Sequence, residues 1–249
     1  MRPPAVHASA YQAPLLLHDA ERLHEQLQRL SVDDLRTHMH LSASKAEQTH
    51  GVIQDWSIDQ SGSRPAIDAF LGDIYSGLQV RSFSPADRRY ANDHLLILSG
   101  LYGGLRALDS VHPYRLEMGY RLPLSGHKNL YDFWADKIAG LVPSQTVVIN
   151  LSAVEYTKAV LPYIKNPVIT PKFLTVSPKT GQPTFVTVHA KIARGAFAHW
   201  LIKHRVSAIK ALSGFTELGY RYDKSASTPD QPVFICHDFK GIGLSVRLS

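Results

Sequence analysis

The chain has 249 residues, 44% of them apolar, which predicts one large domain or two small ones with a sizeable core. It carries 27 Lys and Arg against 21 Asp and Glu, and this net charge of +6 favours anionic partners such as nucleic acid, nucleotides or phosphorylated metabolites. Its one cysteine, Cys236, excludes a disulfide framework and a thiolate metal cluster. No apolar stretch approaches the roughly 18–20 residues that cross a bilayer, and no signal peptide is recognisable, so we expect a cytoplasmic globular protein.

The basic excess lies in the last third of the chain. Residues 1–72 have a net charge of −3, residues 73–160 of +1 and residues 161–249 of +8. If these side chains gather on one face they create a focused positive field, and if they scatter they serve solubility. Charge alone favours the scattered arrangement.

Helical patterns dominate the first hundred residues. Leucines at helical spacing predict a helix over 19–30, and Ser31 with Asp34 predicts a capped helix over 31–40. A third helical run covers 65–70. Ser84, Pro85 and Asp87 have the order of a cap, a first-position proline and a first-turn carboxylate, which predicts a helix that ends near residue 98.

Strand patterns follow after residue 110. Apolar and polar residues alternate over 114–122, which predicts a half-buried strand. Further strands are expected over 147–151, 173–176 and 184–188, and a helix over 190–205. These elements predict an α+β fold with a single domain over 1–249, in which helices wrap a mixed β-sheet.

Common catalytic and cofactor signatures are missing from the sequence, so no cofactor and no metal site is expected. Ser42 and Lys45 fit a Ser-x-x-Lys pattern, but the partner motifs of that hydrolase class are absent. Lys45 is more simply an ion-pair or anion contact.

A glycine-rich run lies between two predicted helices. Three glycines in five positions allow a sharp turn and a close approach to a ligand, and the backbone amides there would form an anion site. The run resembles a helix-hairpin-helix, although it is one residue longer than the usual Gly-x-Gly hairpin. A tight structural turn explains it equally well. The candidate DNA-binding residues in it are Gly100, Tyr102, Gly103, Gly104 and Arg106.

Two further groups combine cations with a carboxylate or a glycine. On the predicted strand, Arg115, Glu117 and Arg121 share a face, either as a structural ion pair or as phosphate-binding arginines oriented by the carboxylate. Lys191 and Arg194, one turn apart on the helix over 190–205, form either a solvated basic face or an anion site, with Arg205 on the same face.

These groups occur together, in this order, in a known bacterial family. The sequence resembles the YaaA peroxide-stress protein family, of the UPF0246 type, over about residues 11–240. The matching segments are Phe70-Leu-Gly-Asp-Ile-Tyr75, Leu98-Ser-Gly-Leu-Tyr-Gly103, Pro113-Tyr-Arg-Leu-Glu-Met-Gly119, Leu130-Tyr-Asp-Phe-Trp134, Val148-Ile-Asn-Leu151 with Glu155-Tyr156, and His189-Ala-Lys191 with Arg194-Gly195. The resemblance implies a single-domain α+β fold with a basic cleft and a helix-hairpin-helix, and links to oxidative stress, DNA binding and DNA repair.

The sequence departs from the family at its amino terminus. Family members usually carry Ser-Pro-Ala-Lys-Thr there, whereas this chain has Arg2-Pro-Pro-Ala-Val-His-Ala-Ser9. If the missing lysine serves the family's activity, this member has lost or changed that activity. A diverged enzyme of specialised biosynthesis is therefore an alternative.

Three functions follow from these observations. The first is binding of double-stranded or branched DNA without established catalysis, in which Arg115, Arg121, Lys191 and Arg194 contact phosphates. The second is an enzyme acting on a nucleotide-like or other small anionic substrate, with Glu117 or Glu155 as acid or base. In that enzyme, cationic support and proton donation or stacking would come from Lys45, Lys191, Tyr75, Tyr131 and Tyr156. The third is an interaction protein whose basic face binds an acidic partner.

Overall fold

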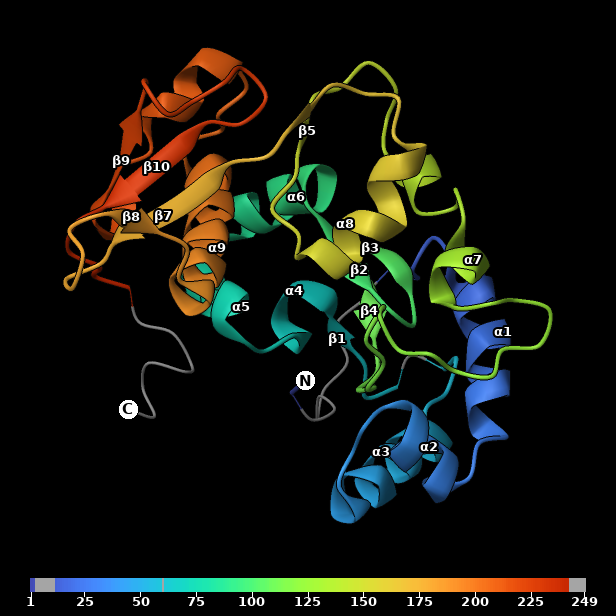
Figure 1. The fold of residues 1–249 in the computed structure, drawn as a ribbon. Helices are drawn as coiled ribbons and strands as arrows, with labels where there is room; N and C mark the ends of the chain where they lie inside the picture. Colours follow the sequence, from blue (N-terminus) through green and yellow to red (C-terminus); the bar gives the residue numbers. More distant parts are fainter. Residues whose placement is uncertain (3–11, 60, 242–249) are drawn as a thin grey trace. The chain divides into compact units, whose positions relative to one another are not determined.

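The computed structural model describes residues 1–2, 12–59 and 61–241 (Figure 1). Within these residues the chain forms two compact units that interleave along the sequence, and each is described by itself. Unit 1 comprises residues 1–69, 95–143 and 153–165, and unit 2 comprises residues 70–94, 144–152 and 166–249. Helices and small sheets occur in both units, which confirms the mixed α and β composition.

Unit 1 begins with three helices joined by tight connections. The predicted cap of the second helix is present, because Ser31 Oγ accepts a hydrogen bond from the Asp34 amide and the Asp34 carboxylate accepts one from the Ser31 amide. The regular elements of unit 1 are α1 (Leu17–Gln28), α2 (Val32–His38), α3 (Ala43–Asp55), β1 (Arg64–Pro65), α4 (Ala66–Ala69), β2 (Leu96–Ser99), β3 (Gly103–Arg106), β4 (Ser110–Val111), α7 (Leu130–Trp134), η2 (Ala139–Leu141), α8 (Val154–Val160) and η3 (Leu161–Tyr163).

Unit 2 contains the longest helix and a mixed sheet with strand order β8-β7-β10-β9. The central strands β7 and β10 are parallel, and the outer strands are antiparallel to their neighbours. The elements are α5 (Asp73–Leu78), η1 (Val80–Ser82), α6 (Pro85–His94), β5 (Val148–Ile149), β6 (Val168–Ile169), β7 (Lys172–Val176), β8 (Pro183–Thr184), α9 (Thr187–Lys203), η4 (Ile209–Gly214), η5 (Glu217–Gly219), β9 (Tyr220–Asp223) and β10 (Val233–Cys236).

An aromatic core joins α9 to this sheet. Phe173 of β7 packs against Phe197 of α9, Phe215, Tyr220 and Phe234, with ring centroids 5.4–6.0 Å apart. All five side chains are buried. Because they lie on one face of the sheet, α9 is held along that face (Figure 1).

Two glycines let α5 and α9 cross at backbone contact. A Cβ atom at Gly195 would lie 1.8 Å from the Ile74 carbonyl oxygen, and one at Gly77 would lie 2.0 Å from the Ile192 carbonyl oxygen. No side chain fits at either position, so both glycines are required by packing.

Five sequence predictions about elements differ from the structure. The run over 98–106 is the β2–β3 hairpin rather than a turn between helices, because Leu96–Ser99 pairs with Gly103–Arg106. The helix before it ends at His94, four residues earlier than expected. Residues 114–122 form no strand. The expected strand over 184–188 is limited to Pro183–Thr184, since α9 begins at Thr187. In the described residues a single wrapped sheet is replaced by one four-stranded and three two-stranded sheets.

Candidate functional site

The glycines of the β2–β3 hairpin lie against other protein groups. A Cβ at Gly100 would meet the Leu116 carbonyl oxygen at 2.3 Å, and one at Gly103 would meet the Trp134 ring at 2.7 Å. Gly103 also has a φ of 68°, and the Gly100 carbonyl accepts a hydrogen bond from Trp134 Nε1. Gly104 is packed in the same way against Leu141. Packing and backbone conformation therefore account for this run, and the phosphate contact expected of it stays a prediction.

Tyr102 and Arg106, from the same hairpin, are engaged inside unit 1. Tyr102 is 1% exposed, and its hydroxyl accepts hydrogen bonds from Trp56 Nε1 and the His112 amide. Burial raises the pKa of Tyr102 to about 12, so the phenol stays protonated. The Arg106 guanidinium donates to the buried Asp109 carboxylate at 2.8–3.0 Å and to the Ala13 carbonyl. Both side chains stabilise the hairpin.

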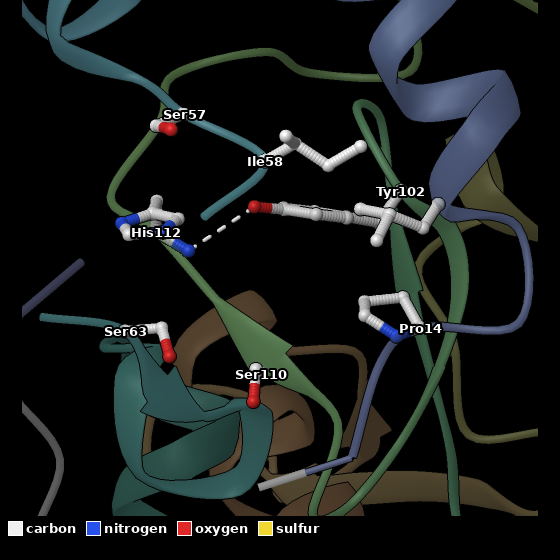
Figure 2. A pocket seen from close by; sticks show the side chains of 8 residues that line it. Pro14, Ser57, Ile58, Ser63, Tyr102, Ser110 and His112 are labelled. Atoms are coloured by element: carbon white, nitrogen blue, oxygen red, sulfur yellow. Dashed lines mark hydrogen bonds between the residues drawn. The ribbon is translucent and has the colours of Figure 1, made fainter. Parts of the chain in front are cut away.

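A small pocket lies beside Tyr102 in unit 1 (Figure 2). Its polar wall includes Ser57, Ser63, Ser110 and His112, and its apolar wall includes Pro14, Leu17 and Ile58. The His112 amide donates to the Tyr102 hydroxyl at 3.1 Å. Nothing in the sequence pattern indicated this pocket, because its lining comes from four separate segments.

The segment 114–122, predicted as a strand, places the carboxylate of Glu117 next to a tyrosine. Arg115, Glu117 and Arg121 are all exposed. Tyr156 of α8 donates its hydroxyl to Glu117 Oε2 at 3.0 Å. The phosphate-binding role of Arg115 and Arg121 stays a prediction.

A second carboxylate and a second tyrosine lie close to this pair. A Cβ at Gly119 would lie 3.3 Å from Glu155 Oε2 and 4.0 Å from the Tyr131 hydroxyl oxygen. Burial and the Glu155 charge raise the pKa of Tyr131. Burial raises the pKa of Tyr156, and the neighbouring Tyr114, Glu117 and Glu155 reinforce the shift. Both phenols therefore stay protonated at neutral pH.

The two cations predicted on α9 differ in their surroundings. Lys191 is exposed, whereas Arg194 is half-buried and burial alone lowers its pKa. Among the described residues no carboxylate or carbonyl pairs with this guanidinium. His189, five residues before Arg194, is held by a 3.0 Å contact between Nδ1 and Thr175 Oγ1 and by stacking on Phe239. An unpaired, half-buried guanidinium favours an anion as its partner.

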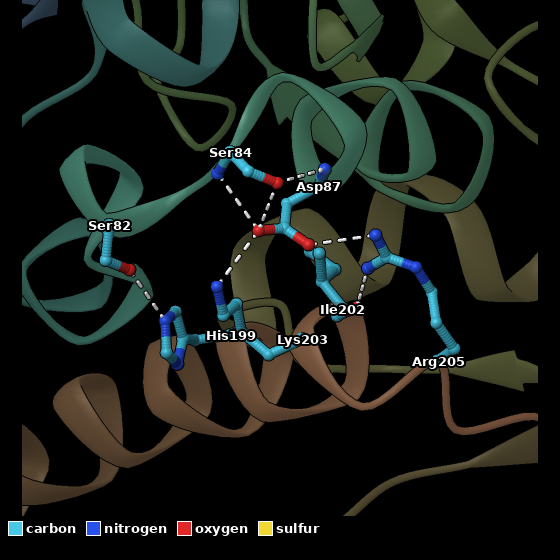
Figure 3. A network of polar contacts seen from close by, with 7 residues as sticks. All are labelled: Ser82, Ser84, Asp87, His199, Ile202, Lys203 and Arg205. Carbon is cyan, nitrogen blue, oxygen red and sulfur yellow. Dashed lines mark hydrogen bonds and ion pairs between the residues drawn. The ribbon is translucent and has the colours of Figure 1, made fainter.

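Arg205 is not part of that pair, because α9 ends at Lys203 and Arg205 has a φ of 50°. Its guanidinium donates to Asp87 Oδ1 at 2.8 Å, while Lys203 donates to Asp87 Oδ2 at 3.0 Å (Figure 3). Arg205 also lies over the Tyr90 ring, 4.2 Å from its centroid. These two cations share one carboxylate within unit 2, and sequence reasoning missed the interaction because more than 100 residues separate the partners.

The remaining catalytic candidates belong to different helices and different units. Lys45 is exposed in the first turn of α3, and Ser42 is the residue before that helix. Tyr75 is on α5 in unit 2, where its ring stacks on Phe70 with centroids 5.4 Å apart. Within the described residues no group of three His, Cys, Asp or Glu side chains could hold a metal ion. The catalytic roles of these residues stay predictions.

Comparison with known proteins gives similarity along nearly the whole chain. The profile of the family described as Peroxide stress protein YaaA matches residues 2–226. A UPF0246 protein of Salinispora tropica is 49% identical over 248 residues, which cover 99% of this chain and 94% of that protein. A UPF0246 protein of Burkholderia lata is 38% identical over 239 residues, covering 92% and 91% of the two chains, and one of Roseobacter denitrificans is 42% identical over 226 residues, 87% of each. No helix in the described part of the chain is both long and apolar enough to span a membrane.

Proposed function

The chain belongs to the YaaA peroxide stress protein family, and from this premise we propose that it binds the phosphate backbone of duplex DNA through unit 2. The observation that carries the proposal is the separation of charge between the units. Unit 2 has 14 Lys and Arg against 7 Asp and Glu, whereas unit 1 has 13 against 14. The entire positive excess of the chain therefore belongs to one unit, where it attracts a polyanion.

Two cations of α9 are the first candidates for phosphate contact. Lys191 is exposed, and Arg194 is half-buried without a protein partner among the described residues. They are separated by three residues on one helix, so they lie on the same side of it. Lys203 and Arg205 are weaker candidates, because both share the carboxylate of Asp87, which offsets one of their two positive charges.

The experiment measures binding of a labelled duplex by fluorescence anisotropy over a series of salt concentrations. We expect affinity that is independent of sequence and falls steeply as salt rises. Lys191→Gln and Arg194→Gln should each weaken binding to every sequence and reduce the salt slope by about one. The matched control is Lys45→Gln, which removes one exposed cation from α3 in unit 1 and should leave the affinity unchanged.

Several outcomes would overturn the proposal. Absence of binding to duplex and junction DNA at low salt would exclude DNA as the partner. An equal effect of Lys45→Gln and Lys191→Gln would show that net charge, rather than unit 2, determines the affinity. Binding to an acidic protein but not to DNA would favour an interaction protein.

A further inference from the structure

His199 of α9 contacts the segment that joins η1 to α6, 117 positions earlier in the chain (Figure 3). Its Nε2 lies 2.9 Å from the Ser82 hydroxyl oxygen, and its ring stacks on Phe83 with centroids 5.4 Å apart and an interplanar angle of 9°. Phe83 is 7% exposed, so the stack buries a large side chain between η1 and α9. The imidazole therefore fixes η1 to α9 within unit 2.

The other nitrogen of this ring has no hydrogen-bond partner. Nδ1 of His199 is buried, and it is the one buried side-chain nitrogen or oxygen in the described part of the chain for which no partner is found. In the neutral imidazole one nitrogen is a donor and the other an acceptor, so the Ser82 hydroxyl at Nε2 can pair with either form of that nitrogen. The contact with Ser82 is thus available to the neutral ring.

A proton on Nδ1 would turn this unpartnered atom into a buried charged donor. In the imidazolium both nitrogens carry a hydrogen, and no group of the described residues accepts the one on Nδ1. An unpaired buried charge costs far more free energy than an unpaired neutral polar atom. The packed position of the His199 ring therefore favours its neutral form.

The charges around His199 differ in sign. Burial is the main reason why the pKa of His199 lies below its usual value, and the positive charge of Lys203 and His204 at the end of α9 lowers it further. Asp87 of α6 acts in the opposite direction, but its carboxylate is shared by Lys203 and Arg205. The described elements that pack on α9 also include α5, β7 and η5, and none of their charged groups is among those that act on His199.

We propose that His199 is a pH-sensitive latch, which holds η1 and the start of α6 on α9 when its ring is neutral and releases them when the ring is protonated. In the released state the ring is solvated and has the ordinary histidine pKa of about 6.5. The latched ring takes up its proton at lower pH, so the contact is fully stable above about pH 6.5 and is weakened as the pH falls below that value. This latch does not depend on the DNA contacts proposed above.

Two other titratable groups of unit 2 must be distinguished from the latch. Asp87 keeps its charge throughout this pH range, because Lys203 and Ser84 hold its pKa far below the usual value. His189 also has a pKa lowered by burial, but it lies ten residues earlier on α9, against Thr175 and Phe239. A local measurement at η1 is therefore needed.

The test is amide hydrogen exchange of the full chain, followed by NMR between pH 7.5 and pH 5. The Ser82 and Phe83 amides donate to the Gln79 and Val80 carbonyls, so their exchange reports the opening of η1. After correction for the pH dependence of exchange itself, we expect their opening constant to rise by up to about tenfold per pH unit below 6.5. Amides of β10 report global unfolding and should change less. The ring signals of His199 should titrate below pH 6.5.

Variants assign the response to one ring. His199→Phe keeps an aromatic ring to stack on Phe83 but carries no nitrogen, so the rise in exchange at low pH should disappear. The matched control is His237→Phe, which replaces an exposed histidine of unit 2 and should leave the rise in place, and His189→Phe should do the same. A corrected exchange rate that is constant from pH 7.5 to pH 5 in wild type, a His199 ring that titrates at or above pH 6.5, or a full response in His199→Phe would each overturn the proposal.

Discussion

The carboxylate of Asp87 lies 3.0 Å from the ammonium nitrogen of Lys203, across 116 residues of chain. The same carboxylate caps its own helix, since it accepts hydrogen bonds from the amide and the hydroxyl of Ser84. Arg205 occupies its other oxygen. Asp87 thus caps the first turn of α6 and also pairs with cations at the end of α9. The loss of its charge should weaken both the cap and the ion pairs.

Replacing Asp87 by asparagine should lower the melting temperature at neutral pH. Lys203 and the two Ser84 hydrogen bonds hold the pKa of Asp87 far below its usual value. A carboxyl whose folded-state pKa is depressed stabilises the fold above its unfolded-state pKa, about 3.9, and loses this contribution as the pH falls further. The difference in melting temperature between Asp87→Asn and wild type should therefore be largest at pH 7 and shrink below about pH 3.9.

Thermal melts across this pH range check the prediction. Asp93→Asn is the matched control, because Asp93 is an exposed residue of the same helix. If the melting temperature of Asp87→Asn stays below that of wild type by the same amount down to the lowest pH, the charge of Asp87 contributes nothing to stability.

Substitution by alanine should destabilise the protein far more at Gly103 than at another glycine with the same backbone conformation. Gly103 and Gly126 have φ values of 68° and 77°, but only Gly103 faces a ring, that of Trp134. Gly126→Ala should cost about 1 kcal/mol for the left-handed backbone. Gly103→Ala adds a 2.7 Å contact, and we expect a further loss of about 1–3 kcal/mol. Chemical denaturation measures both variants, and equal losses would show that Trp134 moves aside freely.

Replacing a helical glycine by alanine should change stability in opposite directions at two positions, one at the crossing of α5 and α9 and the other on α3. Gly195→Ala places a methyl group 1.8 Å from the Ile74 carbonyl oxygen, so the helices must separate, at a cost of about 3 kcal/mol or more. Gly51 is also helical, but an added methyl meets nothing within 4 Å. Gly51→Ala should therefore stabilise the protein by about 0.5–1 kcal/mol. Denaturation midpoints provide the measurement, and a harmless Gly195→Ala would contradict the close crossing.

Local signals were predictable from the sequence, and long-range pairing was not. Ser31 with Asp34 and Ser84 with Asp87 form their caps because both partners lie within one helical turn. The alternation over 114–122 separates the more buried from the exposed side chains. Leu116, Met118 and Leu122 are buried and Tyr114 and Tyr120 half-buried, while Arg115 and Glu117 are exposed. It does not predict a strand partner, and none pairs with this segment in the described residues.

The hairpin after α6 shows the same limit. Leu96–Ser99 is a short apolar run that follows a well-capped helix, and four such residues fit the end of a helix as well as a buried strand. Its partner β3 contains two glycines, which are poor strand formers. Strand propensity therefore did not indicate that this segment is a strand rather than a turn. Only the fit of Gly103 and Gly104 against Trp134 and Leu141 explains why glycines occupy that strand. The Glu117–Tyr156 contact was missed for a similar reason, because it joins residues 39 positions apart.

The single cysteine should be inert in the folded protein, although the family is named for peroxide stress. Cys236 is fully buried on β10, where burial raises the pKa of its thiol. A thiol reacts with peroxide as its thiolate, so both the lack of access and the raised pKa slow the reaction. We expect native protein to resist Ellman's reagent and hydrogen peroxide, and the thiol to be released when denaturant unfolds the chain. Cys236→Ala should keep any DNA binding of the wild type, with or without peroxide treatment. Rapid stoichiometric labelling of the native protein would instead mean that β10 opens readily, and would return Cys236 to consideration as a peroxide-sensitive residue.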